Sequence, residues 1–377
     1  MITNPFIISG KVIREYFCDR EKESEELIRR ITNGQNLVLM SPRRMGKTEL
    51  IKFCYEDERI KNHYYSFFID ILQTNTLSEF ILVFGKAIYY TLVPRSKRMA
   101  RGFLKALISL TGKFSYDAMT GIPSFNIQLG DITQPELTLE EIFGYLDKAD
   151  LRCIVAIDEF QQIANYPERN IEAVLRTYIQ HSTNCNFIFS GSQRHILQEM
   201  FANTARPFFN SATFINLGPI PQADYAEYII RLFKERGKKI TKENAVNIYE
   251  RFEGHTSYVQ RTCNEAFSST PPGRECTVEI ILEAIDTILN TYSTIFREIL
   301  SQLPIKQKEV LYAIAAEGHV SEITSAEFIR RHALTSASSV QSSVKSLISK
   351  EILTRGENTY SLSDRFFQLW IKRQLYL

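Results

Sequence analysis

The stretch NLVLMSPRRMGKTEL (residues 36–50) joins a short apolar run to a Gly-Lys-Thr triplet. The apolar run predicts a buried strand over residues 36–41, and a helical pattern begins at about Lys47. Backbone N–H groups at the start of a helix can bind phosphate oxygens, assisted by the helix dipole. The order strand, loop, helix therefore predicts a phosphate-binding loop, although Ser41 stands where the pattern G-x-x-x-x-G-K-[ST] has its first glycine.

The residue types in this loop suit the binding of ATP with Mg²⁺. Gly46 lets the backbone approach the phosphates closely, and Lys47 can reach the β- and γ-phosphates. The Thr48 hydroxyl is a ligand for Mg²⁺. Pro42 restricts the backbone next to Ser41 and can replace part of the missing glycine's role. The predicted nucleotide-binding residues of the loop are Ser41, Pro42, Arg43, Arg44, Met45, Gly46, Lys47, Thr48 and Glu49.

A second motif, CIVAIDEFQQI (residues 153–163), supplies the acidic partners that a phosphate loop requires. Four apolar residues predict a buried strand that ends in Asp158 and Glu159. We expect Asp158 to hold Mg²⁺ and Glu159 to orient and deprotonate the attacking water. The alternative is a strand that ends in two solvated acids, and the phosphate loop upstream favours the catalytic interpretation.

Two further segments carry candidate site residues. In FIFSGSQ (residues 187–193), Ser190 or Ser192 could contact the γ-phosphate or the water, but the same residues also suit a Gly-Ser turn. In ARPFF (residues 205–209), Arg206 could act as an arginine finger toward a neighbouring subunit. Its alternative is a salt bridge in a loop, and Arg194 is a weaker candidate for the finger.

The periodicity of the chain predicts three parts. Apolar runs at 36–41, 64–71, 153–159, 186–192 and 213–219 alternate with helical patterns, which predicts an α/β core with a five-stranded parallel sheet over residues 1–217. Residues 95–135 are an insertion with a basic amphipathic stretch and a hairpin or loop. Residues 218–300 are helical by period, which predicts a lid domain. Residues 301–377 predict three helices and a small hairpin, the layout of a winged helix.

These motifs, taken in order, resemble the archaeal-type ATPases of the AAA+ superfamily, a group related to the STAND NTPases. The resemblance begins at YFCDREKESEELIRRI (residues 16–31) and implies that Arg20, Glu23 and Leu27 lie near the base and ribose. It also implies that a serine at the first loop position is common in the group. The segments GPIPQADYAEYI (218–229) and EGHTSYVQRTCNEAF (253–267) resemble the family's lid. Ser211 stands where relatives often have an arginine, and Arg261 is the candidate for a lid arginine.

The predicted function is Mg-dependent ATP hydrolysis that drives a conformational or assembly change read out through the winged helix. A slow nucleotide switch, as in STAND proteins, and a DNA-binding regulator with a structural nucleotide site remain as alternatives. Predicted partners are a second copy through the ATPase core and DNA or protein through the winged helix. The candidate recognition helix carries Ser338, Ser339, Gln341, Ser342 and Lys345.

Composition narrows the class of protein. The net charge of +2 is nearly balanced, and the basic stretch at residues 95–105 suits nucleic acid, an anionic membrane, a protein partner or simply solvent. The six cysteines are scattered and form no C-x-x-C pair, which favours reduced thiols. We found no apolar run of about 20 residues and no signal peptide, so we predict a cytoplasmic protein without a transmembrane segment.

Overall fold

The computed structural model describes residues 4–8, 16–18, 20–111, 127–356 and 359–375, without the side chains of residues 108–111. It divides into two compact units, one over Asp19–Gly218 and the other over Met1–Cys18 with Pro219–Leu377. The first unit contains the predicted α/β core. The second contains the described residues of the lid, the winged helix and the N-terminal segment.

The first unit is built on a five-stranded parallel sheet. Its strands are β1 (Leu37–Met40), β2 (Tyr64–Asp70), β3 (Arg152–Asp158), β4 (Cys185–Gly191) and β5 (Thr213–Asn216), in the order β2-β3-β4-β1-β5. The five predicted strands and their parallel pairing are confirmed. Because β1 lies between β4 and β5, and β3 lies beside β4, the ends of the loop strand and the acidic strand come close together.

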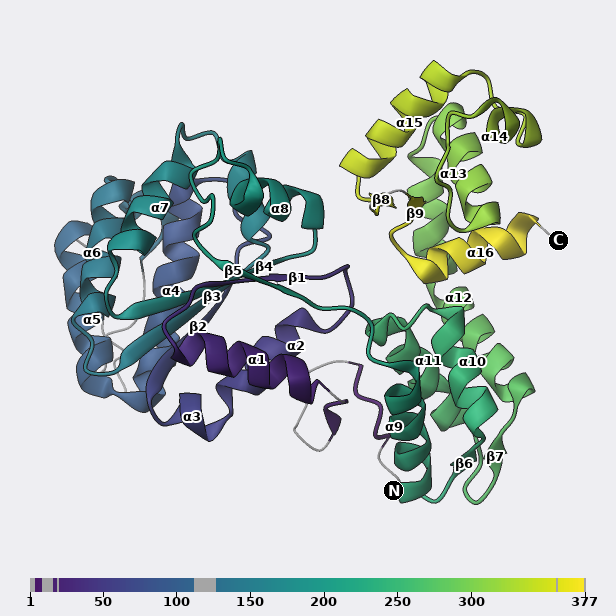
Figure 1. Ribbon diagram of the computed structural model, residues 1–377, viewed down its shortest axis with the longest axis horizontal. Coiled ribbons are helices and arrows are strands. Elements are labelled where there is room, and N and C mark those ends of the chain that lie inside the picture. Colours follow the sequence, from purple (N-terminus) through teal and green to yellow (C-terminus); the bar gives the residue numbers. More distant parts are fainter. Residues whose placement is uncertain (1–3, 9–15, 19, 112–126, 357–358, 376–377) are drawn as a thin grey trace. The chain divides into compact units, whose positions relative to one another are not determined.

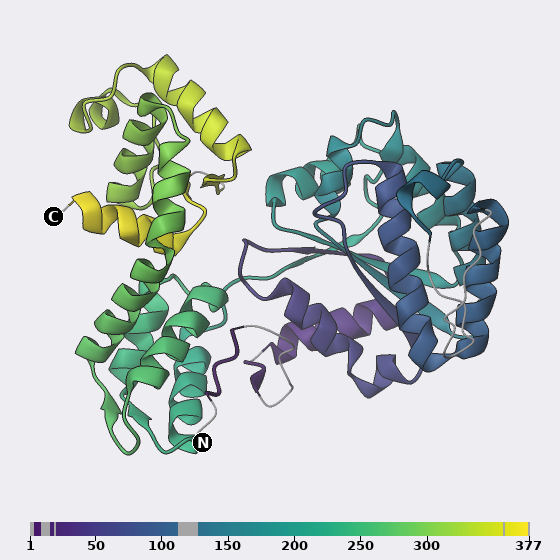
Figure 2. The same cartoon turned by 180° about the vertical axis from the view of Figure 1, so that it is seen from behind.

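Helices cover both faces of this sheet. The helices α1 (Glu21–Thr32), α2 (Lys47–Tyr55) and α3 (Glu58–Lys61) lie on one face, and α7 (Ile171–His181) and α8 (Arg194–Ala202) lie on the other (Figures 1 and 2). The strands are apolar on both faces, as the near-continuous apolar runs predict. Phe187 and Phe189 of β4 point into the core beneath α7 and α8, and the polar Ser190 alternates with them.

The predicted insertion packs onto the β2 side of the core. Helix α4 (Leu77–Arg95) is followed by α5 (Lys97–Thr111), the 3₁₀ turn η2 (Leu129–Asp131) and α6 (Pro135–Asp147). The predicted hairpin or loop falls mostly on residues 112–126, outside the described residues. Phe103, Leu104 and Leu107 of α5 are buried, whereas Lys97, Arg101 and Lys105 are exposed. Over residues 97–107, the apolar face of α5 therefore packs in the core and is not available to a membrane.

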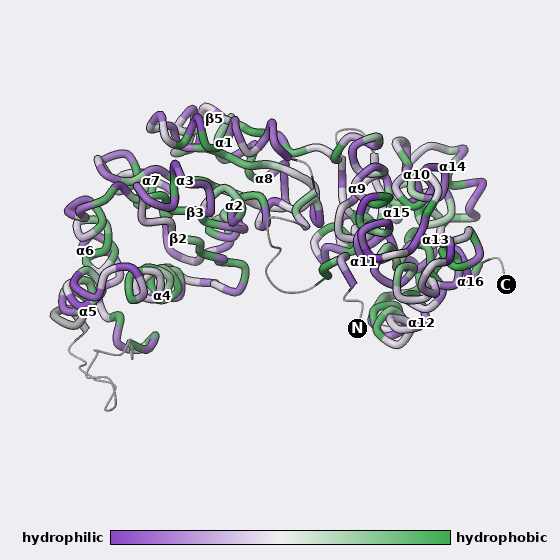
Figure 3. The backbone as a smooth tube through the Cα atoms, turned by 90° about the horizontal axis from the view of Figure 1, so that it is seen from below, coloured by the Kyte–Doolittle hydropathy of each residue, from purple (hydrophilic) through white to green (hydrophobic). Residues whose placement is uncertain are grey.

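Within the described residues one helix, α4, is long and apolar enough by length and composition to cross a membrane. In the structure it is a helix of the core, since Phe80, Phe84 and Ile88 are buried there. Hydrophobic and hydrophilic residues alternate along the helices of both units (Figure 3), as expected for helices that bury one face.

The second unit begins with a helical part. It contains α9 (Gln222–Glu235), β6 (Lys239–Ile240), α10 (Lys242–Arg251), α11 (Thr256–Ser269), β7 (Glu275–Cys276) and α12 (Val278–Ser301). The short strands β6 and β7 pair in parallel and were not predicted.

The rest of this unit has the predicted winged-helix layout. It contains α13 (Ile305–Glu317), α14 (Ala326–Arg331), α15 (Ala337–Ser349) and the antiparallel pair β8 (Leu353–Arg355) and β9 (Tyr360–Leu362). A last helix, α16 (Arg365–Leu375), follows the hairpin and was not predicted.

The grouping of residues differs from the predicted division in two respects. Phe6, assigned to the core by the sequence, is only 1% exposed and packs against Phe233 and Phe267 of the lid at ring distances of 5.5 and 6.0 Å. In addition, the lid and the winged helix share one hydrophobic core. Tyr258 of α11, for example, packs edge-on against Phe366 of α16 at 5.0 Å.

Candidate nucleotide-binding site

The phosphate loop leaves β1 and turns into α2 through residues with left-handed backbone conformations. Gly46 caps α2 with φ +86° and ψ +22°, a conformation that glycine adopts without a steric penalty. Arg44 also has a positive φ, +66°. Ser41 is 1% exposed, and its hydroxyl donates to the Pro42 carbonyl oxygen at 2.8 Å. The hydroxyl of Ser41 is therefore hydrogen-bonded although it is buried, so a serine fits where the pattern has glycine.

Lys47 and Thr48 open α2 and face the end of β3. The Thr48 hydroxyl donates to Asp158 Oδ2 at 2.8 Å, and the Ser190 hydroxyl donates to Asp158 Oδ1 at 2.6 Å. Lys47 is 7% exposed. Burial lowers the pKa of its ammonium group, while the nearby carboxylates of Glu159 and Asp158 act in the opposite direction. The structure thus brings together four of the predicted site residues, from β3, β4 and α2.

This donor set suits Mg²⁺ held together with phosphate. Thr48 and Asp158 offer a hydroxyl and a carboxylate, which are the oxygen ligands that Mg²⁺ prefers. Among the described residues no group of three or more His, Cys, Asp or Glu side chains could hold a metal ion. A site with few protein ligands fits Mg²⁺ in particular, because this ion usually keeps several waters and binds substrate phosphates.

Glu159 follows the strand in a left-handed conformation, with φ +56°. Its carboxylate Oε2 accepts hydrogen bonds from the Ser192 backbone N–H at 3.2 Å and from the Ser192 hydroxyl at 2.8 Å. A third donor, Gln161 Nε2, lies at 2.5 Å from the same oxygen. Arg43 of the phosphate loop in turn donates from Nε to the Ser192 hydroxyl at 3.4 Å. Sequence reasoning named Ser192 and Glu159 but missed Gln161, although it lies in the same IDEFQ motif.

Arg20 connects the start of α1 to the phosphate loop. It is 4% exposed, pairs with Glu23 at 2.8 Å, and donates from Nη2 to the Met45 carbonyl oxygen at 3.3 Å. Leu27, which the resemblance placed near the base, is fully buried on the inner face of α1. Glu49 pairs with Lys52 at 3.6 Å along α2.

The sequence matches a family model described as an ATPase domain found mainly in archaea, over residues 17–261. The chain belongs to this ATPase family. A second model, described as a probable winged helix domain, matches residues 294–373. No curated protein sequence matches the chain. The protein is therefore a P-loop ATPase that carries a winged helix.

Solved structures with the same fold support this architecture. The Walker-type ATPase PABY2304 of Pyrococcus abyssi is 19% identical, with a TM-score of 0.66, and the match covers 98% of this chain and 99% of that one. The ORC2 protein of Aeropyrum pernix, in ADPNP–ADP complexes, is 13% identical with a TM-score of 0.55 and 98% coverage of both chains. The ORC1 protein of Aeropyrum pernix in complex with DNA is 12% identical, with a TM-score of 0.50 and coverage of 97% and 94%.

The arginines that the sequence offers as a finger or as a lid arginine make contacts away from the phosphate loop. Arg206 pairs with Glu172 at 2.5 Å and with Glu199 at 3.6 Å, both in its own unit. This is the salt-bridge alternative of the sequence analysis, and the finger role stays a prediction. Arg194 is exposed at the start of α8. Arg261 lies over the ring of Tyr292 at 5.3 Å, within the helical unit.

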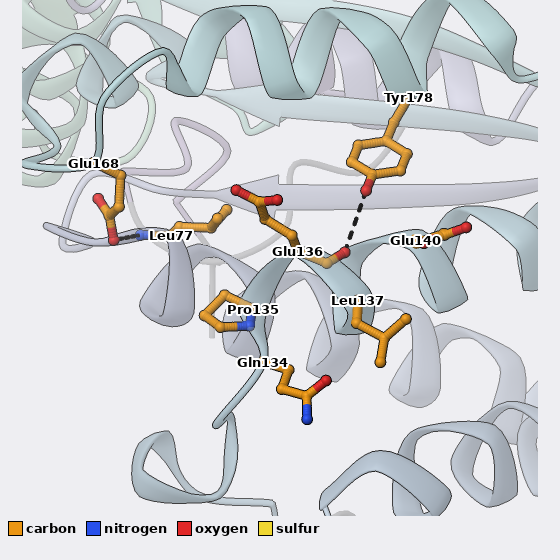
Figure 4. Close-up of a pocket in the computed structure, with 8 residues that line it drawn as sticks. All are labelled: Leu77, Gln134, Pro135, Glu136, Leu137, Glu140, Glu168 and Tyr178. Carbon is orange, nitrogen blue, oxygen red and sulfur yellow. Dashed lines mark hydrogen bonds between the residues drawn. The ribbon is translucent and has the colours of Figure 1, made fainter.

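A separate hollow of the ATPase lies between the start of α4, the start of α6 and α7 (Figure 4), with a volume of about 530 Å³. Three glutamates line it, and one of them, Glu168, accepts from the Leu77 backbone N–H at 2.9 Å. A lining with three carboxylates disfavours an anionic nucleotide. None of the predicted site residues lines this hollow, whose lining residues are Leu77, Gln134, Pro135, Glu136, Leu137, Glu140, Glu168 and Tyr178.

Proposed function

We propose that the ATPase hydrolyses Mg-ATP at the phosphate loop and that the lid and winged helix together respond to the nucleotide state. The observation that carries the first part is the contact between Thr48 and Asp158 beside the buried Lys47. A buried ammonium group next to paired oxygen ligands suits a triphosphate with its metal.

Each residue has a defined task in this proposal. Lys47 binds the β- and γ-phosphate oxygens, and Thr48 and Asp158 hold Mg²⁺, which when bound neutralises charge on the phosphates. Glu159 accepts a proton from the attacking water, since it is the acid next to the metal site that is not bonded to Thr48. Ser190 keeps Asp158 in place through their 2.6 Å hydrogen bond.

Thermal denaturation with ATP tests the binding residues. Wild-type protein should gain stability with ATP, and gain more when Mg²⁺ is present, because a ligand that binds only the folded state stabilises it. Lys47→Ala should lose both gains, and Thr48→Ala should lose the additional gain from Mg²⁺. Lys52→Ala is the matched control, because Lys52 lies on the same helix and its side chain is 43% exposed. Equal ATP effects in wild type and Lys47→Ala would refute the assignment.

The response of the winged helix rests on its attachment to the lid. The carboxylate of Glu253, which follows α10, contacts Arg365 of α16 at 2.6 Å and His319 at 2.7 Å. Trp370 of α16 donates to the Ser293 hydroxyl of α12 at 3.3 Å. Because these contacts add to a shared apolar core, a movement of the lid would carry the winged helix with it. The same arrangement serves a fast ATPase and a slow nucleotide switch, which turnover rate distinguishes.

A second candidate function is DNA binding through α15. Its outer face exposes Ser338, Gln341, Ser342 and Lys345, groups that can donate to phosphates and bases. We expect salt-sensitive binding of duplex DNA, weakened by Lys345→Ala but not by Lys306→Ala on α13. Point substitutions are preferable to removal of the winged helix, because removal would expose the core that it shares with the lid. Binding that neither salt nor Lys345→Ala changes would argue against this function.

Self-association and location complete the proposal. A homo-oligomer through the ATPase core is proposed on the family resemblance, and Arg206 would have to leave Glu172 to act across such an interface. We propose a cytoplasmic location, which the six buried cysteines suit because none of them forms a disulfide in the structure and reducing compartments disfavour disulfides.

A further inference from the structure

We propose that Gln161 is a positioning residue for Glu159, and that Gly191 is a glycine in order to leave room for the Gln161 side chain. The inference rests on the proposed role of Glu159 as the base. Gln161 lies in the 3₁₀ helix η3 (Phe160–Asn165), and Gly191 is the last residue of β4. Neither residue has a place in the nucleotide-binding pattern itself.

The amide of Gln161 is held in one orientation. The side chain is 3% exposed, and its Nε2 donates to Glu159 Oε2 at 2.5 Å. Its Oε1 is buried and finds no hydrogen-bond partner among the residues that the structure describes. A buried acceptor without a partner costs stability. The opposite orientation would set the amide oxygen against a carboxylate oxygen, so the donor contact with Glu159 is what favours the orientation observed.

Gly191 is the residue that permits this placement. A Cβ atom at Gly191 would lie 1.9 Å from Gln161 Oε1 and 2.9 Å from Leu197 Cδ1. Any larger residue would therefore push the amide away from Glu159, while the backbone of β4 could remain in register with Met40 of β1. The absence of a side chain at Gly191 thus keeps the Gln161 amide in place and, through it, the Glu159 carboxylate.

The hydrogen bonds distinguish the two carboxylate oxygens of Glu159: one is held in place, and the other is left to accept a proton. Gln161 Nε2, Ser192 N and Ser192 Oγ all converge on Oε2. The other oxygen, Oε1, is then the one that can accept the proton of the attacking water. Fixing one oxygen removes rotation of a carboxylate whose residue already has an unusual backbone, with φ +56°. We infer that Gln161 raises the rate of the chemical step and leaves ATP affinity unaffected.

The first test compares Gln161→Leu with Gln162→Leu in steady-state ATP hydrolysis. Gln162 is the matched control, because its side-chain amide donates to the Thr74 carbonyl oxygen at 3.1 Å and not to the Glu159 carboxylate. Its backbone N–H donates to the Glu159 carbonyl oxygen at 2.9 Å, a hydrogen bond that Gln162→Leu keeps. We expect kcat of Gln161→Leu to fall roughly 10- to 100-fold, the scale of a small misplacement of a reacting group, with KM for ATP within about twofold of wild type. An unchanged kcat would overturn the inference, and so would an increased kcat, which would make the contact inhibitory.

Two further variants separate positioning from a general structural role. Gln161→Glu should be most active in the pH range where the two adjacent carboxyls hold one proton between them, which the introduced carboxyl can donate to Glu159, and should lose that activity as pH rises and the pair loses this proton. Gly191→Ala should lower kcat in the wild-type background but have little further effect on kcat in Gln161→Ala, because the displaced amide is then already absent. Independent, multiplicative effects on kcat would overturn the role of Gly191.

ATP hydrolysis by Glu159→Gln separates failure of the positioning role of Gln161 from failure of the proposed role of Glu159 as the base. If that variant is inactive while Gln161→Leu matches wild type, Glu159 remains the base and only the positioning role fails. If Glu159→Gln is as active as wild type, both fail. Retained binding of ADP in every variant shows that the nucleotide site is still folded.

Discussion

Phe6 provides a direct test of how the chain is divided. Its ring is 1% exposed and packs against Tyr228, Phe233 and Phe267 at ring distances of 6.4, 5.5 and 6.0 Å. Replacement of a buried phenylalanine by alanine costs about 3–5 kcal/mol in a well-packed core. A short segment outside the helices and strands can relax into the space, so we take the lower end, about 3 kcal/mol.

The loss should be confined to the helical unit. For a unit of 150–250 residues, each 1 kcal/mol lowers Tm by about 2–4 °C, so Phe6→Ala should lower the transition of this unit by about 6–12 °C. Hydrogen exchange should accelerate in α9 and α11 and remain unchanged in β1 and β4, because opening is local to cooperative units. Ile8→Ala is the control, since Ile8 is 45% exposed on the same segment. Equal losses from both variants, or faster exchange in β1 and β4 of Phe6→Ala, would refute the reasoning.

Two further predictions concern ion pairs. Burial raises the pKa of Glu172, and the charge of Arg206 acts in the opposite direction. Arg206→Ala should therefore raise the pKa of Glu172 further and lower the stability of the core more at pH 8, where the carboxylate is ionised without a partner, than at pH 5. If the ion pair is only structural, kcat of Arg206→Ala should stay near that of wild type. Burial also raises the pKa of Glu253, but the hydrogen bond from His319 and the charge of Arg365 lower it more, so that its net pKa lies below the ordinary value of a glutamate. Its contribution to stability is therefore present above about pH 4.5 and lost as pH falls through the folded-state pKa, and Glu253→Gln should flatten that part of the denaturation profile.

The arrangement of the candidate site was largely predictable because Thr48, Asp158 and Ser190 lie at or near strand ends that the sequence marks. Buried apolar runs end at Ser41, at Asp158 and near Ser190, and parallel strands bring such ends to one edge of a sheet. Gln161 was missed because its role depends on the side-chain orientation and on the space beside Gly191, which are set by packing between β3 and β4. The sequence does carry a signal, because Gln161 follows the proposed base Glu159 by two residues, a spacing that allows their side chains to form a hydrogen bond.

The division of the chain was harder to predict. Phe6 is a single aromatic residue in a short segment, and no periodicity indicates which core it joins. The shared core of lid and winged helix depends on α16, whose Phe366 and Trp370 contact Tyr258 and Ser293 of the lid, residues far away in the sequence. The strands β6 and β7, of two residues each, are too short for a sequence pattern to indicate.

The most direct test of the account is ATP hydrolysis by wild type and Glu159→Gln at saturating Mg-ATP, over a range of protein concentrations. We predict turnover by wild type and a loss of about 10²- to 10⁴-fold in the variant, which is the usual contribution of a general base, with ATP binding retained. Equal rates in the two proteins would contradict the assignment of Glu159 as the base and, with it, the proposed mechanism.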